Sequence, residues 1–266
     1  MNEPVFSLHQ GSSPLLVSVP HAGTHIPPAM RHLFTPKALA VEDTDWHLDV
    51  IYDDVKTQHA SLLRPHLSRY VVDLNRPPDG AAMYPGVNNT GFCPTTDFEG
   101  LAIYQAGCAP DAAQMAQRRV DYWQPYHDAL AQELARIKAV HGYAVLFDGH
   151  SIKSHLPWLF EGKLPDLNIG TASGSSCATN LREAIAHLLA QQNGFTYAID
   201  GRFKGGYITR HYGQPSQGIH AVQLEMCWST YMQEAAPFTL DPQRHARLAP
   251  VLQQLTQLLA SVVPHA

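Results

Sequence analysis

Short apolar runs alternate along the chain with longer segments in which apolar residues recur at helical spacing. The short runs are rich in Val, Ile, Leu and aromatic residues and are bounded by Gly, Pro or polar residues, which is typical of buried strands. We therefore predict strands at residues 14–19, 68–74, 143–150, 166–171, 195–199 and 219–226. Residues 205–213 predict a strand or a loop.

The longer periodic segments predict helices, which we place at residues 36–58, 110–141, 178–193 and 241–263. In the first, Trp46, Val50 and Val55 recur at helical spacing, and we expect a break near Asp43–Thr44. Pro250 predicts a kink in the last helix. Residues 75–109 are rich in Gly, Pro, Asn and Thr, and a loop of this length in a compact domain is often functional.

This alternation of strands and helices predicts an α/β fold with three layers. We expect a mixed, mostly parallel central sheet with helices on both faces. No repeat or low-complexity linker divides the chain, so residues 1–266 form one expected domain. In such sheets the ligand site lies beyond the carboxyl ends of the strands.

Polar residues follow four of the predicted strands at that edge. The four strand ends present His21, the pair Asn75 and Arg76, His150 with Ser151, and Glu225. Two imidazoles, an arginine, an asparagine and a carboxylate would therefore meet on one rim of the sheet.

This set of side chains fits a catalytic zinc site. Such a site uses three ligands drawn from His, Asp or Glu and keeps one position open for water. His21 and His150 fill two positions. The candidates for the third are His25, Glu42, Asp43 and Asp45. We favour Asp45, because it opens the helix that follows the His21 loop and adjoins Trp46, which can anchor it.

Two further residues complete the hydrolytic chemistry. Glu225 is the expected general base, because a carboxylate in an apolar strand must be paired or functional. Arg76 is the expected donor to the developing oxyanion. The alternative for Glu225 is a buried ion pair with Arg76 or Arg210.

Three other local patterns give weaker evidence of function. His25 lies four residues after His21, but Gly23 and the surrounding prolines disfavour the helix that would align the two. Ser151 lacks the GxSxG elbow of a serine nucleophile. The segment TASGSSC at 171–177 lacks the pattern of a phosphate-binding loop.

Composition limits the remaining possibilities. Apolar residues make up 45% of the chain and charged residues 15%, with a net charge of −5, as in a globular protein. No block of Lys or Arg suggests a nucleic-acid partner, and no apolar run is long enough to span a membrane. The N-terminal residues show no signal-peptide pattern, so we expect a cytoplasmic protein whose four cysteines are free thiols.

Taken in order, the segments VPHAGTHIP, DTDWHLD, SRYVVDLNRPP, NTGFCPTTDFEGLAIY, LFDGHSI, DLNIGTASGSSC, GGYITRHYG and HAVQLEMCWSTYM resemble the N-formylglutamate amidohydrolases. The resemblance runs from about residue 14 to 233. It implies a fold similar to the zinc carboxypeptidases and to succinylglutamate desuccinylase and aspartoacylase. It also implies hydrolysis of N-formyl-L-glutamate to L-glutamate and formate with a divalent metal, in histidine degradation.

The resemblance assigns roles at matching positions. His21 and His150 match two metal ligands, Glu225 matches the general base, and Asn75 with Arg76 matches a pair that grips the substrate. Zinc carboxypeptidases place a glutamate three residues after the first histidine, whereas this chain has Thr24 there. The third ligand must therefore come from elsewhere, and Asp45 remains our choice.

The implied small-molecule substrate carries two carboxylates, so its site needs cations besides the metal. Arg76 and Arg210 are the expected cations, with Arg202 or Lys204 as further candidates, and Thr95 and Ser151 are expected hydroxyl donors. We expect Zn²⁺ as the metal, and a homo-oligomer is possible. Two alternatives stay open: a deacylase of another N-acyl acidic amino acid, and a non-catalytic metal-binding or amino-acid-binding protein.

Overall fold

A computed structural model describes residues 4–81, 88 and 90–265 of the chain. Seven strands form one sheet in the order β1-β3-β2-β4-β7-β5-β6. The strands are β1 Phe6–His9, β2 Leu15–Ser18, β3 Ser61–Pro65, β4 Ala144–Ile152, β5 Leu167–Gly170, β6 Tyr197–Ile199 and β7 Ile219–Cys227. Four of the six pairings are parallel, and β1 with β3 and β5 with β7 are antiparallel. The predicted mixed, mostly parallel sheet is confirmed.

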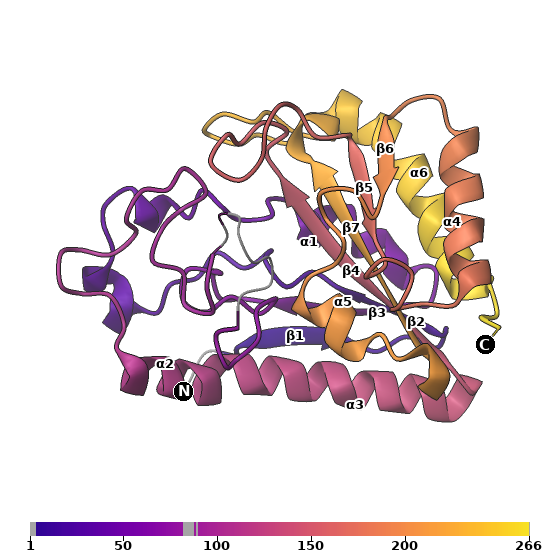
Figure 1. Cartoon of the computed structure of the whole chain (residues 1–266), viewed down its shortest axis with the longest axis horizontal. Helices are drawn as coiled ribbons and strands as arrows, with labels where there is room; N and C mark the ends of the chain where they lie inside the picture. Colours follow the sequence, from indigo (N-terminus) through magenta and orange to yellow (C-terminus); the bar gives the residue numbers. More distant parts are fainter. Residues whose placement is uncertain (1–3, 82–87, 89, 266) are drawn as a thin grey trace.

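Helices cover both faces of this sheet (Figure 1). They are α1 Leu48–Ile51, α2 Ala112–Arg118, α3 Gln124–His141, α4 Thr179–Gln191, α5 Tyr207–Tyr212 and α6 Pro242–Ser261. The π-helical turn Arg119–Trp123 joins α2 to α3. Helices α3 and α5 contact one face of the central strands, while α1 and α6 contact the other and α4 packs on α6. The three-layer arrangement is therefore also confirmed.

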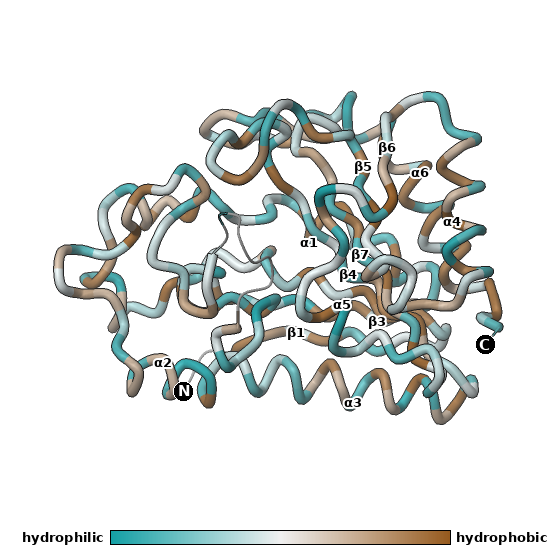
Figure 2. The backbone as a smooth tube through the Cα atoms, in the orientation of Figure 1, coloured by the Kyte–Doolittle hydropathy of each residue, from teal (hydrophilic) through white to brown (hydrophobic). Residues whose placement is uncertain are grey.

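Alternation along the central strands divides the core between the two faces. On β2, Leu15 and Val17 join the cluster under α4 and α6, whereas Leu16 joins the cluster under α3. Helix α3 accordingly alternates between hydrophobic and hydrophilic residues along its length (Figure 2). Among the described helices, none combines the length and the apolar character needed to cross a lipid bilayer.

Most predicted elements are confirmed with shifts of a few residues. The runs at 14–19, 143–150, 166–171, 195–199 and 219–226 are β2, β4, β5, β6 and β7. The segments 110–141, 178–193 and 241–263 contain the long helices, and Pro250 lies inside α6.

The helix predicted at 36–58 is wrong in its extent, whereas the break expected near Asp43–Thr44 is present. This segment contains only the short helix α1 and the 3-10 turns Ala38–Ala40 and Asp53–Lys56. Val41 and His47 have positive φ angles of 47° and 63°: Val41 ends the turn Ala38–Ala40 before Asp45, and His47 precedes α1 after it. The break turns Asp45 inward, where it is only 1% exposed.

The predicted strand at 68–74 is also wrong. The segment folds as turns, and the strand that pairs with β2 is β3, Ser61–Pro65. Its apolar residues are buried, but Val71 packs in one hydrophobic cluster and Val72 in another. The apolar pattern therefore predicted burial correctly, without a ladder of strand hydrogen bonds.

The segment 205–213, predicted as a strand or loop, contains the helix α5. Asn75, from a distant part of the chain, caps its first turn. The backbone N–H of Ile208 donates to Asn75 Oδ1 at 2.8 Å, and that of Tyr207 donates to the Asn75 carbonyl at 3.4 Å. These bonds satisfy N–H groups that a helix start leaves unpaired, and no local sequence signal announces them.

Candidate functional site

The two longest strands change character towards their carboxyl ends. On β4, the face that carries Leu146 under α3 continues with Asp148 and His150. The parallel partner β7 places Gln223 beside Asp148 and Glu225 beside His150. All four polar side chains are buried. The hydrophobic core of this face therefore gives way to a polar site where the strands end.

His21 reaches this site because the chain turns sharply after β2. A Cβ atom on Gly23 would lie 2.2 Å from the Leu67 carbonyl oxygen, so only glycine allows this close approach. The His21 carbonyl accepts a hydrogen bond from the Asp45 N–H at 3.0 Å, which ties the two segments together. His25 instead bridges to Leu67 and does not line the pocket.

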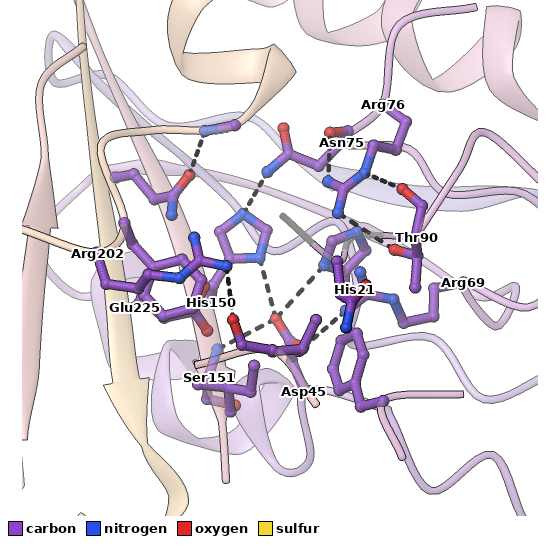
Figure 3. A pocket seen from close by; sticks show the side chains of 17 residues that line it. His21, Asp45, Arg69, Asn75, Arg76, Thr90, His150, Ser151, Arg202 and Glu225 are labelled. Atoms are coloured by element: carbon purple, nitrogen blue, oxygen red, sulfur yellow. Dashed lines mark hydrogen bonds and ion pairs between the residues drawn. The ribbon is translucent and has the colours of Figure 1, made fainter. Parts of the chain in front are cut away.

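His21, Asp45 and His150 form a group that can hold a metal ion. Each offers one ligand atom, and these atoms lie within 4.8 Å of one another. Asp45 Oδ2 lies 3.1 Å from His150 Nδ1 and 3.8 Å from His21 Nδ1. Both imidazoles therefore direct Nδ1 towards the same carboxylate oxygen (Figure 3). Two histidines and a carboxylate are a ligand set of the kind found in catalytic zinc sites.

Two further carboxylates fix the orientation of these imidazoles. His21 Nε2 lies 2.8 Å from Asp73 Oδ1, and His150 Nε2 lies 3.0 Å from Asp148 Oδ2. Carboxylates in this position hold the Nε2–H tautomer, which leaves Nδ1 as the lone-pair donor. The arrangement is typical of metal-ligating histidines.

Arg69 balances the negative charge of this group. Its guanidinium donates to Asp73 Oδ2 at 2.7 Å and lies 3.8 Å from Asp45 Oδ1. It also lies over the ring of Phe98, 4.6 Å from the centroid. The Arg69 side chain is 6% exposed, so its guanidinium neutralises charge without the competition of bulk water.

Burial and charge shift the pKa values of these groups in different directions. Burial, together with the Arg69 charge, lowers the pKa of His21. Burial would also lower that of His150, but the charges of Asp148 and Asp45 raise the His150 pKa well above its ordinary value. Burial alone would raise the pKa of Asp73, yet His21 and Arg69 hold it well below its usual range.

Glu225 projects from β7 next to His150 and is 8% exposed. Burial raises its pKa to about 8, and the nearby charge of Asp45 acts in the same direction. A carboxylate whose pKa lies near neutrality has the basicity that a general base needs. A cation bound beside Glu225 would favour its ionised form.

Asn75 and Arg76 lie in a turn rather than at the end of a strand. Asn75 Nδ2 donates to Asp148 Oδ2 at 3.2 Å and lies 2.8 Å from His150 Nε2. Arg76 donates from Nε to the Thr90 carbonyl at 2.7 Å and from Nη2 to Thr90 Oγ1 at 3.2 Å. Thr90 belongs to the long loop, which therefore orients the arginine at the pocket.

The site opens into one pocket of about 590 Å³, a volume that includes solvent at its mouth, whereas Asp73 and Asp148 lie behind the imidazoles and do not line it. Among the residues that the structure describes, the other lining side chains are either polar or apolar. The polar ones are Asn88, Thr90, Ser151, Arg202 and Gln223, and the apolar ones are Phe98, Ile152, Leu159 and Phe203.

Two residues predicted to bind the substrate lie elsewhere. Arg210 is exposed on α5, beside Ser173 and Lys204. Thr95 is exposed, and its carbonyl accepts a backbone hydrogen bond from Ile103. Neither residue is part of the pocket lining. Periodicity assigns a residue to a segment but does not say which way that segment faces.

Ser151 lines the pocket, but its hydrogen bonds hold neighbouring residues of the site in place. Its backbone N–H donates to Asp45 Oδ2 at 3.2 Å. Its hydroxyl meets Trp228 Nε1 at 3.2 Å and the Tyr231 hydroxyl at 2.7 Å. Ser151 therefore supports Asp45 from the opposite side to Arg69.

Sequence reasoning missed four charged or polar supports: Arg69, Asp73, Asp148 and Gln223. Two of them had a readable signal. Asp148 lies two residues before His150, so both point to the same face of one strand. Gln223 stands in the same relation to Glu225. For Arg69 and Asp73, the incorrect strand prediction placed the two side chains on one face but concealed the turn that makes them a pair.

Comparisons of this chain with known proteins agree on one family. A family model for N-formylglutamate amidohydrolase matches residues 13–232. An N-formylglutamate deformylase of Pseudomonas aeruginosa is 46% identical over 255 residues, which cover 96% of each chain. One of Pseudomonas putida is also 46% identical over 255 residues, covering 96% of this chain and 95% of that protein.

Solved structures show the same fold. The crystal structure of N-formylglutamate amidohydrolase from Ralstonia eutropha JMP134 has a TM-score of 0.79 at 23% identity, covering 96% of this chain and 97% of that one. A gene product of Agrobacterium tumefaciens has a TM-score of 0.75 at 19% identity, with 97% and 96% coverage.

Proposed function

The chain belongs to the N-formylglutamate amidohydrolase family, and we propose that it hydrolyses N-formyl-L-glutamate to L-glutamate and formate. The observation that carries this proposal is the convergence of three buried ligand atoms, those of His21, Asp45 and His150, beside the carboxylate of Glu225. The relatives' names supply the substrate, and we propose that the reaction serves histidine degradation.

We propose that His21, Asp45 and His150 hold a divalent cation, for which Zn²⁺ fits the donor set best. When bound there, such a cation polarises the formyl carbonyl and lowers the pKa of water. Asp73 and Asp148 keep both imidazoles in the tautomer that exposes Nδ1.

Glu225 acts as general base in this proposal. Its carboxylate takes a proton from the attacking water as the water oxygen bonds to the formyl carbon. The same proton then passes to the amide nitrogen as the C–N bond breaks, which releases glutamate as the amine and formate as the acid. Burial of Glu225 makes it basic enough for the first transfer.

Arg76 offers charge-assisted hydrogen bonds at the pocket wall, either to the oxyanion that develops on the formyl oxygen or to a substrate carboxylate. Thr90 holds the guanidinium in place through two contacts. Asn75 precedes Arg76 in the chain, and its side-chain amide contacts Asp148 and His150. Asn75 therefore connects the arginine to one of the two imidazoles.

Release of formate from N-formyl-L-glutamate tests the proposal directly. We expect turnover that a chelator abolishes and Zn²⁺ restores. Glu225→Gln should lose turnover by a factor on the order of 100 or more, with unchanged metal content. Glu183→Gln, at an exposed position of α4, is the matched control and should behave as wild type.

The same assay separates the alternatives. Faster hydrolysis of N-acetyl- or N-succinyl-L-glutamate would favour the deacylase alternative and overturn the proposed substrate. Stoichiometric metal without turnover on any of the three compounds would favour a binding protein. A protein that binds no metal and ignores chelators would contradict the metal site.

A further inference from the structure

A substrate with two carboxylates raises the question of which cations receive them. Three arginines line the described pocket: Arg69, Arg76 and Arg202. Arg69 is committed to Asp73 at 2.7 Å and lies near Asp45. Arg210, an expected cation, lies outside the pocket. Besides Arg69, the arginines of the described residues that line this pocket are therefore Arg76 and Arg202.

The segment that carries Arg202 is held firmly between β6 and α5. The Asp200 carboxylate accepts from the Thr171 N–H and hydroxyl, both at 2.7 Å, and pairs with Arg182 at 3.0 Å. At the other end, the Gly206 N–H donates to Gln223 Oε1 at 2.7 Å. Both ends of the loop 200–206 are thus anchored to the sheet or to a helix.

Close backbone packing adds to this anchoring. A Cβ atom on Gly170 would lie 2.5 Å from the Gly205 nitrogen, so β5 and this loop are in direct contact. The guanidinium of Arg202 itself donates from Nη2 to the Leu159 carbonyl at 3.0 Å. A guanidinium has five N–H donors, so this bond is compatible with carboxylate binding.

Arg202 and Arg76 lie on opposite sides of His150 in the pocket (Figure 3). The apolar side chains of Leu159 and Phe203 line the wall near Arg202. Apolar surroundings lower the local dielectric and strengthen a charge-assisted bond. The two arginines thus flank the group of imidazoles over which the formyl carbonyl would lie.

We propose that Arg202 binds one carboxylate of the substrate from its side of His150, while Arg76 lies on the opposite side. Arg202 would thereby make the pocket selective for N-acylated dicarboxylic amino acids. This inference rests on the proposed function. It assigns selectivity to a loop residue rather than to α5, where Arg210 lies.

Paired substrates and variants test the inference. The substrates are N-formyl-L-glutamate and its two monoamides, N-formyl-L-glutamine and N-formyl-L-glutamate α-amide. Arg202→Gln removes the charge but keeps a donor for the Leu159 carbonyl, and Arg210→Gln is the control. We expect Arg202→Gln to lower kcat/KM for N-formyl-L-glutamate on the order of 100-fold and to leave one monoamide within about threefold, because that compound already lacks the carboxylate which Arg202 binds.

Equal losses on all three substrates, or no loss on any, would overturn the role of Arg202. A loss for Arg210→Gln that matches Arg202→Gln would overturn it too. Wild-type protein that releases no formate at all would overturn the proposed function first. The melting temperatures of both variants should equal that of wild type, which separates selectivity from misfolding.

The π-helical turn Arg119–Trp123 contacts the segment that carries Arg76. Three side chains on and around this turn hold carbonyls of the segment that ends in Arg76. Arg118 donates to the Val71 carbonyl at 2.9 Å, Trp123 donates to that of Arg76 at 3.2 Å, and His127 donates from Nε2 to that of Leu74 at 2.9 Å.

The π geometry explains how residues five apart reach one segment. In a continuous α-helix, Arg118 and Trp123 would point about 140° apart, at about 100° per residue. A π turn bonds residue i to residue i+5, which brings such residues onto the same face. His127 then stacks on Trp123 with ring centroids 3.7 Å apart. We infer that the π turn is a positioning device for Arg76, with Trp123 as the positioning residue that contacts its backbone.

A double-mutant cycle tests this second inference. Trp123→Phe keeps an aromatic ring against His127 but loses the N–H that reaches Arg76. We expect it to lower kcat/KM roughly 5- to 10-fold in wild type, the range for one hydrogen bond, and to have no effect in an Arg76→Ala background. Val120→Ala is the control, because Val120 belongs to the same turn and is 64% exposed.

Equal effects of Trp123→Phe in both backgrounds would overturn the positioning role, because the tryptophan would then act independently of Arg76. A merely structural role for Trp123 predicts that outcome together with a lowered Tm. The positioning role predicts a kinetic loss that depends on Arg76 while the Tm stays within a few degrees of wild type.

Discussion

The buried carboxyl group of Glu225 leads to a prediction about stability as well as catalysis. Burial raises its pKa from an ordinary 4.5 to about 8 in the protein without bound metal. Glu225→Gln replaces the carboxyl with a neutral group of nearly the same shape that does not titrate. In metal-free protein, we therefore expect the variant to be more stable than wild type at high pH.

The sign follows from proton binding. Between pH 4.5 and about 8 the folded wild type keeps the Glu225 proton, whereas the unfolded chain has lost it. The folded state binds more protons, so the stability of wild type falls as pH rises through this window. A full shift of this size corresponds to about 4 to 5 kcal/mol, at 1.36 kcal/mol per pKa unit. Below pH 4.5 this contribution disappears, because both states are protonated.

Thermal unfolding in the presence of a chelator, at pH 5 and pH 8.5, measures the effect. The difference in Tm between variant and wild type should be larger at pH 8.5 by on the order of 10 °C. Saturating Zn²⁺ should reduce that difference, because a neighbouring cation favours the ionised carboxylate. A difference that does not change with pH, or a variant that is less stable than wild type at pH 8.5, would refute the reasoning.

Three other substitutions test the supports of the site. Asp45→Asn should weaken Zn²⁺ binding on the order of 100-fold, measured by competition with a chromogenic chelator; unchanged affinity would exclude Asp45 as a ligand. Asp73→Asn should destabilise the protein by about 3 to 5 kcal/mol at pH 7 in urea unfolding, because it leaves Arg69 buried without its carboxylate. Since the pKa of Asp73 lies well below 3.8, the difference in stability between wild type and variant should shrink only as pH falls below that value, and a difference that already shrinks near neutral pH would contradict the assignment. Gly23→Ala should cost roughly 1 to 3 kcal/mol in the same assay, because its Cβ meets the Leu67 carbonyl at 2.2 Å; a wild-type midpoint would show that the backbone moves aside easily.

The sequence was sufficient for the parts of the fold that hydrophobic pattern alone controls. Strands β2, β4 and β7 are apolar on both faces at their starts, and the pattern located each within a few residues. The long helices α3 and α6 were likewise evident from periodicity. Burial of apolar surface dominates the stability of these elements, and the order of apolar and polar residues along the chain predicts that burial directly.

The failures occurred where polar tertiary contacts override local preference. The segment around Asp45 has helical spacing, yet left-handed residues break it and turn the carboxylate towards two histidines. The segment that ends in Asn75 has a strand-like composition, yet its carbonyls accept hydrogen bonds from side chains of α2 and α3 instead of a neighbouring strand. Both misassigned segments belong to the site, where contacts between distant residues decide the backbone path.

The sequence by itself determined the α/β architecture and the strand ends that carry His21, His150 and Glu225, and it favoured Asp45 over His25 as a proposed ligand. Only the tertiary structure decided the supports: Arg69 between two carboxylates, Asp73 and Asp148 behind the imidazoles, and Arg202 rather than Arg210 at the pocket. The reason is physical. Burial depends on the local pattern of side chains, whereas a charge is stabilised by whichever opposite charge folding brings within a few ångströms.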